Sequence, residues 1–496
     1  MVENKIEKSS YRSILKATST FGGLQIFLIL ISLVKGKLVA VLLGATGVGI
    51  NSLFNSSLSM ITTISGLGLN SSAVREISQS YESGDIDKLS KTVKVFKTLL
   101  KYCSIFGVVI LCSFSPLLSK ITFGNYNYIL SFILLSIVLV STLLTQGNTS
   151  LLQGTRKLNY TAKSTLIGSI ISLCLSIPLY YFFGINGIVP ALILASIGTY
   201  LVSRYFSKKL FIKTQYLRKD EILSSGKEMA KLGIAMIIAQ LLGQMSVFLL
   251  NSFISKNGGV ADVGFFQAAM SMTTQAVTLV FAAMGADYYP RLVAVCNDKV
   301  KLSETVNQQG EILILIASPI LLFLMIFSPI IIYILLSPEF FVITDIIRLI
   351  SFGMLFKVVS YSIGYISFAK GDRKTFLLLE GIYGNISQLT FNIIGYILAG
   401  LKGLAFSFIL IFVIYFILVS IVAYKKYNYK ISKSYFKTLF PIIIFSCTTL
   451  IISSSKNQLI VYGLGSIMIV FSVIFSYKEL NKRIDFKYVF KKILKK

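Results

Sequence analysis

Residues 153–157 read QGTRK and residues 370–374 read KGDRK, and a long apolar run follows each motif. The first run ends at GING, residues 184–187, and the second ends at GLKG, residues 400–403. Another apolar run follows both glycine motifs. Two such matches in the same order predict that the chain contains two copies of one structural unit.

A weaker pair of segments extends the duplication toward the start of each copy. Residues 42–50 read LLGATGVGI and align with residues 257–265, which read NGGVADVGF. An offset larger by one residue places Arg75 opposite Arg291. We therefore expect six apolar spans in each copy.

The composition identifies the solvent of these spans. Of the 496 residues, 55% are hydrophobic and only 14% are charged, and the mean hydropathy is +0.78. Crossing a hydrocarbon layer of about 30 Å takes about 20 helical residues. Runs of that kind predict an all-α polytopic membrane protein with fourteen spans, near residues 15–43, 47–69, 95–118, 127–152, 161–183, 186–206, 229–255, 264–285, 310–336, 343–369, 376–399, 403–424, 438–454 and 458–477.

The first span has the basic start of a signal peptide but lacks its end. No A-x-A-like cleavage site follows the run from Leu24 to Val34, and apolar residues resume at Leu38. A signal peptide would carry such a site after its apolar region. We interpret this segment as a retained helix.

The formal charge of +28 is distributed between the spans. Alternate connections carry 38 Lys and Arg, whereas the opposite side has only Lys120, Lys256, Lys402 and Lys456. The positive-inside rule then places both termini in the cytoplasm. A nucleic-acid-binding protein would gather its basic residues in a folded module, so we expect no nucleic-acid partner.

The reactive side chains of this sequence do not indicate an enzyme. It contains no His, and its five Cys form no CxxC pair. A metal site or a catalytic triad usually draws on such residues. We expect no catalytic residue, no metal and no cofactor, with a Na⁺ or H⁺ gradient or the membrane potential left open as the coupling force.

Two copies of six spans enter the membrane from the same side, which makes them parallel repeats. Parallel repeats are typical of transporters in which two bundles rock around a substrate site. A duplicated channel or scaffold is the alternative. We predict an N-terminal lobe at 1–220, a C-terminal lobe at 221–427, and two further helices with a basic tail at 428–496.

Charged residues at membrane depth are the best candidates for function, because burying a charge there costs at least ~2.5 kcal/mol. Lys35 and Lys37 lie deep in the first span if that span is one helix ending at Gly44. If the helix stops at Val34 instead, both lysines lie in an outer loop. Lys357 is near the middle of the tenth span. This mainly basic set predicts an anionic cargo.

Two more charges, Arg348 and Glu380, lie nearer the ends of their spans, where snorkelling toward water explains them. Uncharged polar residues complete the candidate substrate-binding set: Gln25, Asn51, Asn55, Gln244 and Gln267. Such side chains bind sugars, but Asn and Gln also join membrane helices by hydrogen bonds. The sequence leaves both roles open.

Three segments carry a resemblance to a known family: residues 42–50, residues 263–292 (VGFFQAAMSMTTQAVTLVFAAMGADYYPRL) and residues 361–380 (YSIGYISFAKGDRKTFLLLE). They resemble the Wzx family of O-antigen and related lipid-linked oligosaccharide flippases, within the multidrug/oligosaccharidyl-lipid/polysaccharide exporter (MOP) superfamily. The similarity covers about the first twelve spans.

The resemblance implies a MATE-like fold of two six-helix lobes in a V shape around a central cationic cavity. It also implies transport of an undecaprenyl-diphosphate-linked repeat unit for O-antigen, lipopolysaccharide or another surface polysaccharide across the bacterial inner membrane. Partners would include membrane lipids, a polysaccharide polymerase and chain-length machinery.

Individual residues follow from the same resemblance. Lys35 stands where related flippases often have Arg, and Arg75 and Arg291 correspond to basic positions after the second helix of each lobe. Both arginines fall near the predicted cytoplasmic mouth, so substrate contact and the positive-inside rule remain alternatives. Spans thirteen and fourteen resemble the lipid II flippase branch, which leaves peptidoglycan precursor export as an alternative. A multidrug or cation antiporter is a third.

Overall fold

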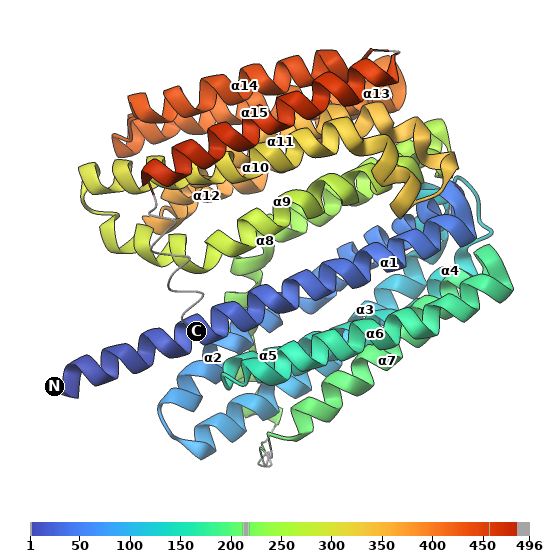
Figure 1. Cartoon of the computed structure of the whole chain (residues 1–496). Coiled ribbons are helices and arrows are strands. Elements are labelled where there is room, and N and C mark those ends of the chain that lie inside the picture. The colour runs from blue at the N-terminus through green and yellow to red at the C-terminus, as the bar shows by residue number, and fades with distance from the viewer. Residues whose placement is uncertain (1, 211, 213–216, 218, 456, 484–496) are drawn as a thin grey trace. The chain divides into compact units, whose positions relative to one another are not determined.

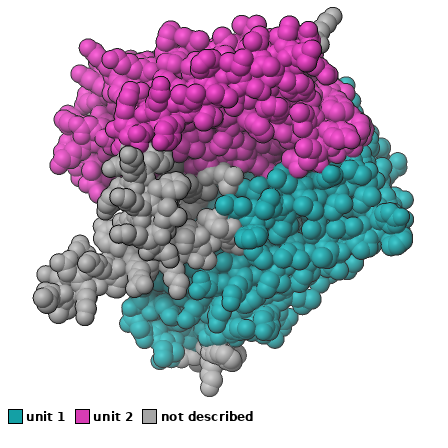
Figure 2. Space-filling view, in the orientation of Figure 1, with its two compact units in different colours: residues 1–264 teal, residues 265–496 magenta. Residues whose placement is uncertain are grey.

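The computed structural model describes residues 2–210, 212, 217, 219–455 and 457–483. All regular elements in these ranges are helices (Figure 1). The chain divides into two compact units, residues 1–264 and 265–496 (Figure 2). The all-helical prediction is confirmed.

The first unit is built from long helices joined by short turns. In chain order they are α1 Val2–Gly66, α2 Leu69–Glu82, α3 Ile86–Phe123, α4 Ile129–Leu134, α5 Ser136–Gly154, α6 Leu158–Phe183, the 3₁₀ turn η1 Gly184–Gly187, α7 Ile188–Lys208 and α8 Lys219–Gly258. α8 was predicted in the C-terminal lobe, yet it packs on α1, α2 and α3. The predicted lobe boundaries stay a prediction.

The second unit takes most of α9 and everything after it. Its elements are α9 Val260–Val295, α10 Lys299–Leu335, η2 Pro338–Ile343, α11 Thr344–Ala369, α12 Arg373–Phe376, the π-helix η3 Leu377–Tyr383, α13 Gly384–Tyr427, α14 Lys433–Ser453 and α15 Gln458–Arg483. α14 and α15 both pack against α10 and against each other.

The span count agrees with the sequence. Nine helical segments of the described chain are long and apolar enough to cross a membrane. Three of them, Gln25–Gly66, Leu158–Lys208 and Arg373–Tyr427, contain a non-helical residue or a 3₁₀ turn and therefore supply two spans each. α9 and α11, which are 36 and 26 residues long, are not among the nine; if they also cross the membrane, the total is fourteen.

The duplicated glycines form the same turns in both copies. Gly44, between the first two spans, has φ 65°, and Gly259, between α8 and α9, has φ 92°. Gly184 and Gly400, from the GING and GLKG motifs, have φ 53° and 57°. Residues with a Cβ rarely adopt these angles, so glycine at each position lets the chain reverse between spans.

Apolar side chains from four helices form the centre of the first unit. Phe54 on α1 packs edge-on against Phe132 of α4, with ring centroids 5.4 Å apart, and both side chains are fully buried. Leu111 of α3 and Leu139 of α5 belong to the same cluster. This packing fixes the helices that carry the polar residues described next.

Candidate functional site

Lys35 lies inside an uninterrupted stretch of α1 that runs to Gly44, where the first non-helical backbone angles occur. The alternative in which the helix stops at Val34 is therefore wrong. Nine residues separate Lys35 from Gly44, which corresponds to about 13 Å along the axis. The half-buried Lys35 donates from Nζ to Ser172 Oγ of α6 over 3.3 Å. Lys37, two residues further along α1, is exposed.

The predicted polar residues of the first unit do not all behave alike. The Asn55 amide donates to the Asn51 carbonyl oxygen over 2.7 Å and to Asn51 Oδ1 over 3.1 Å. This pair is on one helix, so these bonds do not join two helices. Gln25 and Gln244 are half-buried. Within the described residues, no hydrogen bond connects Lys35 with these four side chains.

A polar pocket of about 300 Å³ lies between α1, α2, α5 and α8. Its lining contains hydroxyl and amide groups and no charged side chain: Thr62, Thr63, Asn70, Ser71, Thr145, Gln146, Thr149, Ser150 and Gln240. Asn70 Nδ2 donates to Gln146 Oε1 over 2.7 Å, whereas the buried Asn70 Oδ1 has no partner. Neutral donors and acceptors of this kind suit a ligand rich in hydroxyl groups.

In the second unit, Lys357 of α11 lies beside an aromatic ring and a carboxylate. Its Nζ is 5.4 Å from the centroid of the Phe412 ring, a distance at which cation and ring attract. Glu380 lies within electrostatic reach of Lys357, although the two form no direct ion pair. The Tyr415 hydroxyl donates to Glu380 Oε1. Three elements, α11, η3 and α13, therefore contribute to one charged cluster.

The local backbone explains how Glu380 reaches this cluster. Glu380 belongs to the π-helix η3, and such turns often occur at functional sites. A Cβ on Gly364 of α11 would lie 2.8 Å from Glu380 Oε1, so the missing side chain leaves room for the carboxylate. Snorkelling stays a prediction for Glu380, because the residue is exposed and its carboxylate also accepts a hydrogen bond from a neighbouring helix.

Arg348 has protein partners near the start of α11. Its NH1 donates to Asp345 Oδ1 over 3.3 Å, and its Nε donates to the Met325 carbonyl oxygen over 3.3 Å. Asp345 also accepts from Lys402 at 2.9 Å. Protein contacts rather than bulk water therefore satisfy Arg348.

The two arginines that the duplication aligns are exposed. Arg75 is on α2, and Arg291 on α9 donates from NH2 to Gln309 Oε1 over 3.0 Å. Gln267, also on α9, is half-buried. Arg75 belongs to the first unit, and Arg291 and Gln267 belong to the second. Substrate contact by any of the ten predicted residues stays a prediction.

The sequence analysis did not identify Tyr415, nor the pair formed by Tyr361 and Tyr365. The hydroxyls of Tyr361 and Tyr365 on α11 are 2.9 Å apart, and the Tyr361 ring stacks on Phe281 of α9 at 4.1 Å. The available signal was the four-residue spacing of Tyr361 and Tyr365, which puts both on one helix face.

The described residues contain no group of three or more His, Cys, Asp or Glu side chains that could hold a metal ion. Within each unit, the polar groups described above are amides, hydroxyls and charged side chains. Such groups can bind an anion and a glycan without any covalent step.

Comparison with known proteins places these features in context. Residues 14–295 match a family described as polysaccharide biosynthesis protein. The chain is 21% identical over 367 residues to the lipid III flippase of Escherichia coli strain K12, covering 72% of this chain and 84% of that protein.

Solved structures show the same fold. The lipid II flippase MurJ in an inward closed conformation matches with a TM-score of 0.69 at 15% identity, covering 95% of this chain and 99% of that one. An inward-facing multidrug resistance MATE family transporter of the MOP superfamily also gives 0.69, at 18% identity, with 81% and 94% covered. The predicted MATE-like architecture is confirmed.

Proposed function

Because this chain belongs to the polysaccharide biosynthesis protein family, we propose that it is a flippase for a lipid-linked oligosaccharide. It would move an undecaprenyl-diphosphate-linked repeat unit, of O-antigen or a related surface polysaccharide, from the cytoplasmic to the outer leaflet of the bacterial inner membrane. Transport would occur by alternating access with both termini in the cytoplasm, and a polymerase and chain-length machinery would act afterwards.

Lys35 is the single observation that carries this proposal. Its only hydrogen-bond partner in the described chain is the neutral Ser172 hydroxyl, and no carboxylate there forms an ion pair with it. An uncompensated charge at this depth is costly and is normally functional. Lysine contacts phosphate as a point charge, which tolerates the changing geometry of a moving cargo. We assign Lys35, with Lys37 and Lys357, to the diphosphate.

The polar pocket between α1, α2, α5 and α8 supports binding of the glycan. Its amides and hydroxyls can exchange hydrogen bonds with sugar hydroxyls. We also assign Asn51, Asn55 and the predicted Gln25, Gln244 and Gln267 to the glycan, although none of them lines this pocket. Arg75 and Arg291 would attract the diphosphate at the cytoplasmic entrance.

The membrane potential would favour this direction of transport. Moving a negative charge outward across the full field gains about 2.3 kcal/mol per 100 mV when the inside is negative. The two charges of a diphosphate would double that gain. The potential alone could therefore drive export, and a Na⁺ or H⁺ gradient could reset the empty carrier.

Export of lipid II is the second candidate, and the full-length match to MurJ favours it. That structure covers 95% of this chain, whereas the MATE structure covers 81%. A multidrug or cation antiporter is the least supported function, because Lys35, Lys37 and Lys357 would repel a cationic drug.

Translocation in proteoliposomes tests the proposal. Purified protein is reconstituted with a fluorescent lipid-linked oligosaccharide, and the fraction that becomes accessible in the opposite leaflet is measured over time. We expect translocation with unchanged glycan mass, and a strong loss in Lys35→Ala. Lys163→Ala is the matched control, because Lys163 is an exposed lysine on α6, the helix that carries Ser172. Chain extension of the glycan, or full activity in Lys35→Ala, would overturn the proposal.

The same assay separates the two cargo classes. Unlabelled lipid II and unlabelled undecaprenyl-diphosphate oligosaccharide are each added in excess as competitors. Stronger competition by the oligosaccharide supports the surface-polysaccharide assignment. Stronger competition by lipid II transfers the function to peptidoglycan precursor export.

A further inference from the structure

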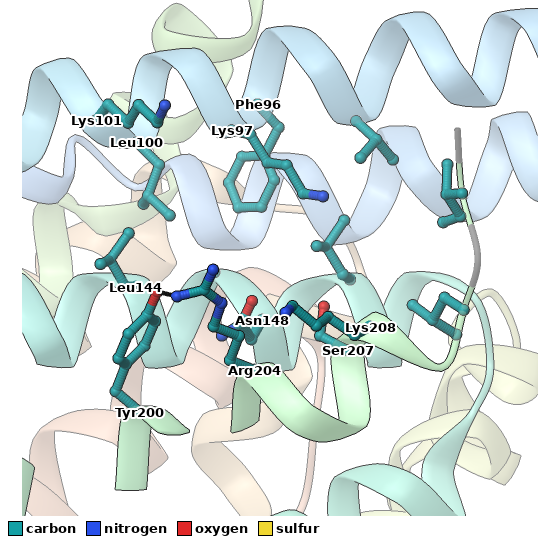
Figure 3. A pocket seen from close by; sticks show the side chains of 15 residues that line it. Phe96, Lys97, Leu100, Lys101, Leu144, Asn148, Tyr200, Arg204, Ser207 and Lys208 are labelled. Atoms are coloured by element: carbon teal, nitrogen blue, oxygen red, sulfur yellow. Dashed lines mark hydrogen bonds between the residues drawn. The ribbon is translucent and has the colours of Figure 1, made fainter. Parts of the chain in front are cut away.

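A second pocket, of about 430 Å³, lies within the first unit between α3, α5 and α7 (Figure 3). None of the predicted substrate-binding residues lines it. Gly147 lets α5 approach α3 closely here, because a Cβ at this position would lie 2.3 Å from Leu100 Cδ2. Asn148 Nδ2 donates to Ser203 Oγ of α7 over 3.0 Å, which ties α5 to α7. The pocket is thus built by packing of three helices.

Four basic side chains surround this pocket. Lys97 and Lys101 are four residues apart on α3, and Arg204 and Lys208 are four residues apart on α7. Figure 3 shows Lys97 and Arg204 extending into the space between the two helices. Like charges at this spacing destabilise each helix. Two such pairs around one pocket make a strongly positive site.

Within the described chain, no carboxylate neutralises this charge. The pocket lining includes no Asp or Glu, and none of the four basic residues forms an ion pair. Arg204 is held by its own helix, since NH1 donates to the Tyr200 hydroxyl over 3.4 Å. A guanidinium oriented in this way is suited to bind a phosphate oxygen.

Much of the remaining lining is apolar, and it places the pocket at a membrane boundary. Val93, Phe96, Leu100, Leu144 and Leu151 supply an apolar wall, beside the polar Asn148, Tyr200 and Ser207. α3 is apolar beyond Tyr102, whereas Lys88, Lys91 and Lys94 precede the pocket, and α7 ends at Lys208. By the positive-inside rule this boundary faces the cytoplasm. A ligand here would meet cations at its head and hydrocarbon beside it.

We propose that this pocket binds the phosphate headgroup of an anionic phospholipid of the cytoplasmic leaflet. Basic pockets between membrane helices on the cytoplasmic side are known to bind such headgroups. The apolar wall would accept the first segments of the acyl chains. Lipid binding at this place would stabilise the packing of α3, α5 and α7 in the first unit.

Native mass spectrometry of the full-length protein in detergent tests this assignment. Dioleoylphosphatidylglycerol and dioleoylphosphatidylcholine are titrated separately, because they share acyl chains and differ in headgroup charge. We expect preferential retention of phosphatidylglycerol. Removing one cation near the membrane surface weakens anionic lipid binding about fivefold, so Lys97→Gln/Arg204→Gln should weaken it about 30-fold. Equal retention of both lipids, or unchanged binding by the double variant, overturns the proposal.

Two control variants distinguish loss of the pocket's charge from misfolding and from a general change in charge. Lys97→Arg/Arg204→Lys keeps both charges and should keep the lipid. Lys91→Gln/Lys163→Gln removes two exposed lysines that do not line the pocket and should also keep it.

Other phosphates distinguish the source of the ligand. Millimolar inorganic phosphate should not displace phosphatidylglycerol, because it lacks the acyl chains that contact the apolar wall. Displacement by inorganic phosphate would make this a free-phosphate site. Displacement by equimolar undecaprenyl diphosphate would reassign the pocket to the cargo, and either result overturns the phospholipid assignment.

Discussion

Gly49 and Gly264 pack backbone against backbone. A Cβ on Gly264 would lie 3.1 Å from Gly49 N and 2.0 Å from the carbonyl oxygen of Ala45, and a Cβ on Gly49 would lie 2.0 Å from the carbonyl oxygen of Val260. In the alignment of residues 42–50 with residues 257–265, Gly264 is the equivalent of Gly49 and Val260 is the equivalent of Ala45. Equivalent residues of the duplicated segments 42–50 and 257–265 therefore contact one another reciprocally within the first unit.

Gly264→Ala should disrupt this contact. The added methyl group would overlap a backbone carbonyl, which cannot move aside as a flexible side chain can. Alanine otherwise favours a helix over glycine by about 1 kcal/mol, so a loss of stability would come from the overlap alone. We expect a lower unfolding temperature and slower translocation. Gly463→Ala on α15 is the control, since its Cβ meets nothing within 4 Å; equal behaviour of the two variants would contradict the close contact.

The contributions of Lys357 and Glu380 to stability should depend on each other. Lys357→Met removes the positive charge and leaves Glu380 with the Tyr415 hydroxyl. Leaving Glu380 without its cationic neighbour should cost more than removing both charges. We expect Lys357→Met to lower the unfolding temperature more than Lys357→Met/Glu380→Gln does. Unfolding of the two single variants and the double variant forms a complete cycle, and strictly additive changes would show that the two groups are independent.

The turns were the part of the fold most readable from sequence. Gly44, Gly184, Gly259 and Gly400 all have positive φ, a conformation that few residues other than glycine adopt, so repeated glycines marked repeated turns. Helix ends were less accessible. α3 begins at Ile86, before the predicted apolar span at 95–118, because Asp85 caps it by accepting from the Lys88 backbone N–H over 2.9 Å. Hydropathy does not register such a cap.

The candidate sites were only partly readable. Lys35 and Lys357 could be found because a charge inside an apolar run is conspicuous. The Glu380–Tyr415 bond joins residues 35 positions apart, and it depends on how α13 packs beside η3. The four basic residues between α3 and α7 are hidden for a different reason, because the positive-inside rule already predicts Lys and Arg at those places. Only the packing of three helices shows that they share a pocket.

Asp372 predicts a specific dependence on pH. Lys426 beside it, with hydrogen bonds from the Tyr427 hydroxyl and from Thr375, holds the pKa of this carboxyl well below its usual range. A depressed carboxyl pKa stabilises the fold above the unfolded value of about 4 and loses that contribution as the pH falls through the folded value. Asp372→Asn keeps a side chain able to cap α12 but loses the charge.

The variant should therefore be less stable than the wild type by about 1 kcal/mol at neutral pH. This gap should stay constant from pH 8 to pH 5 and shrink only below about pH 4. Thermal unfolding of both proteins across this range checks the prediction. A gap that closes between pH 8 and pH 6 would mean that another group is responsible.

Arg483 should be essential for holding α15 on α10. Its Nε donates to Glu311 Oε2 and its NH1 to Glu479 Oε2, both over 2.6 Å, and its NH2 donates to Thr438 Oγ1 over 3.0 Å. The Glu311 side chain is only 5% exposed. Removing one partner of a buried ion pair leaves an uncompensated charge and costs about 3–5 kcal/mol. We expect that loss, measured by denaturant unfolding in detergent, for Arg483→Gln.

The neighbouring residue supplies the control that makes this prediction specific. Lys482 also pairs with Glu479, but its side chain is 70% exposed. Exposed pairs contribute about 0–1 kcal/mol, so Lys482→Gln should be nearly neutral. Arg483→Lys should recover little, because a single ammonium cannot reproduce the fork of donors that reaches both Glu311 and Glu479. Equal losses for Lys482→Gln and Arg483→Gln would mean that net charge, rather than the buried bond to Glu311, secures the last helix.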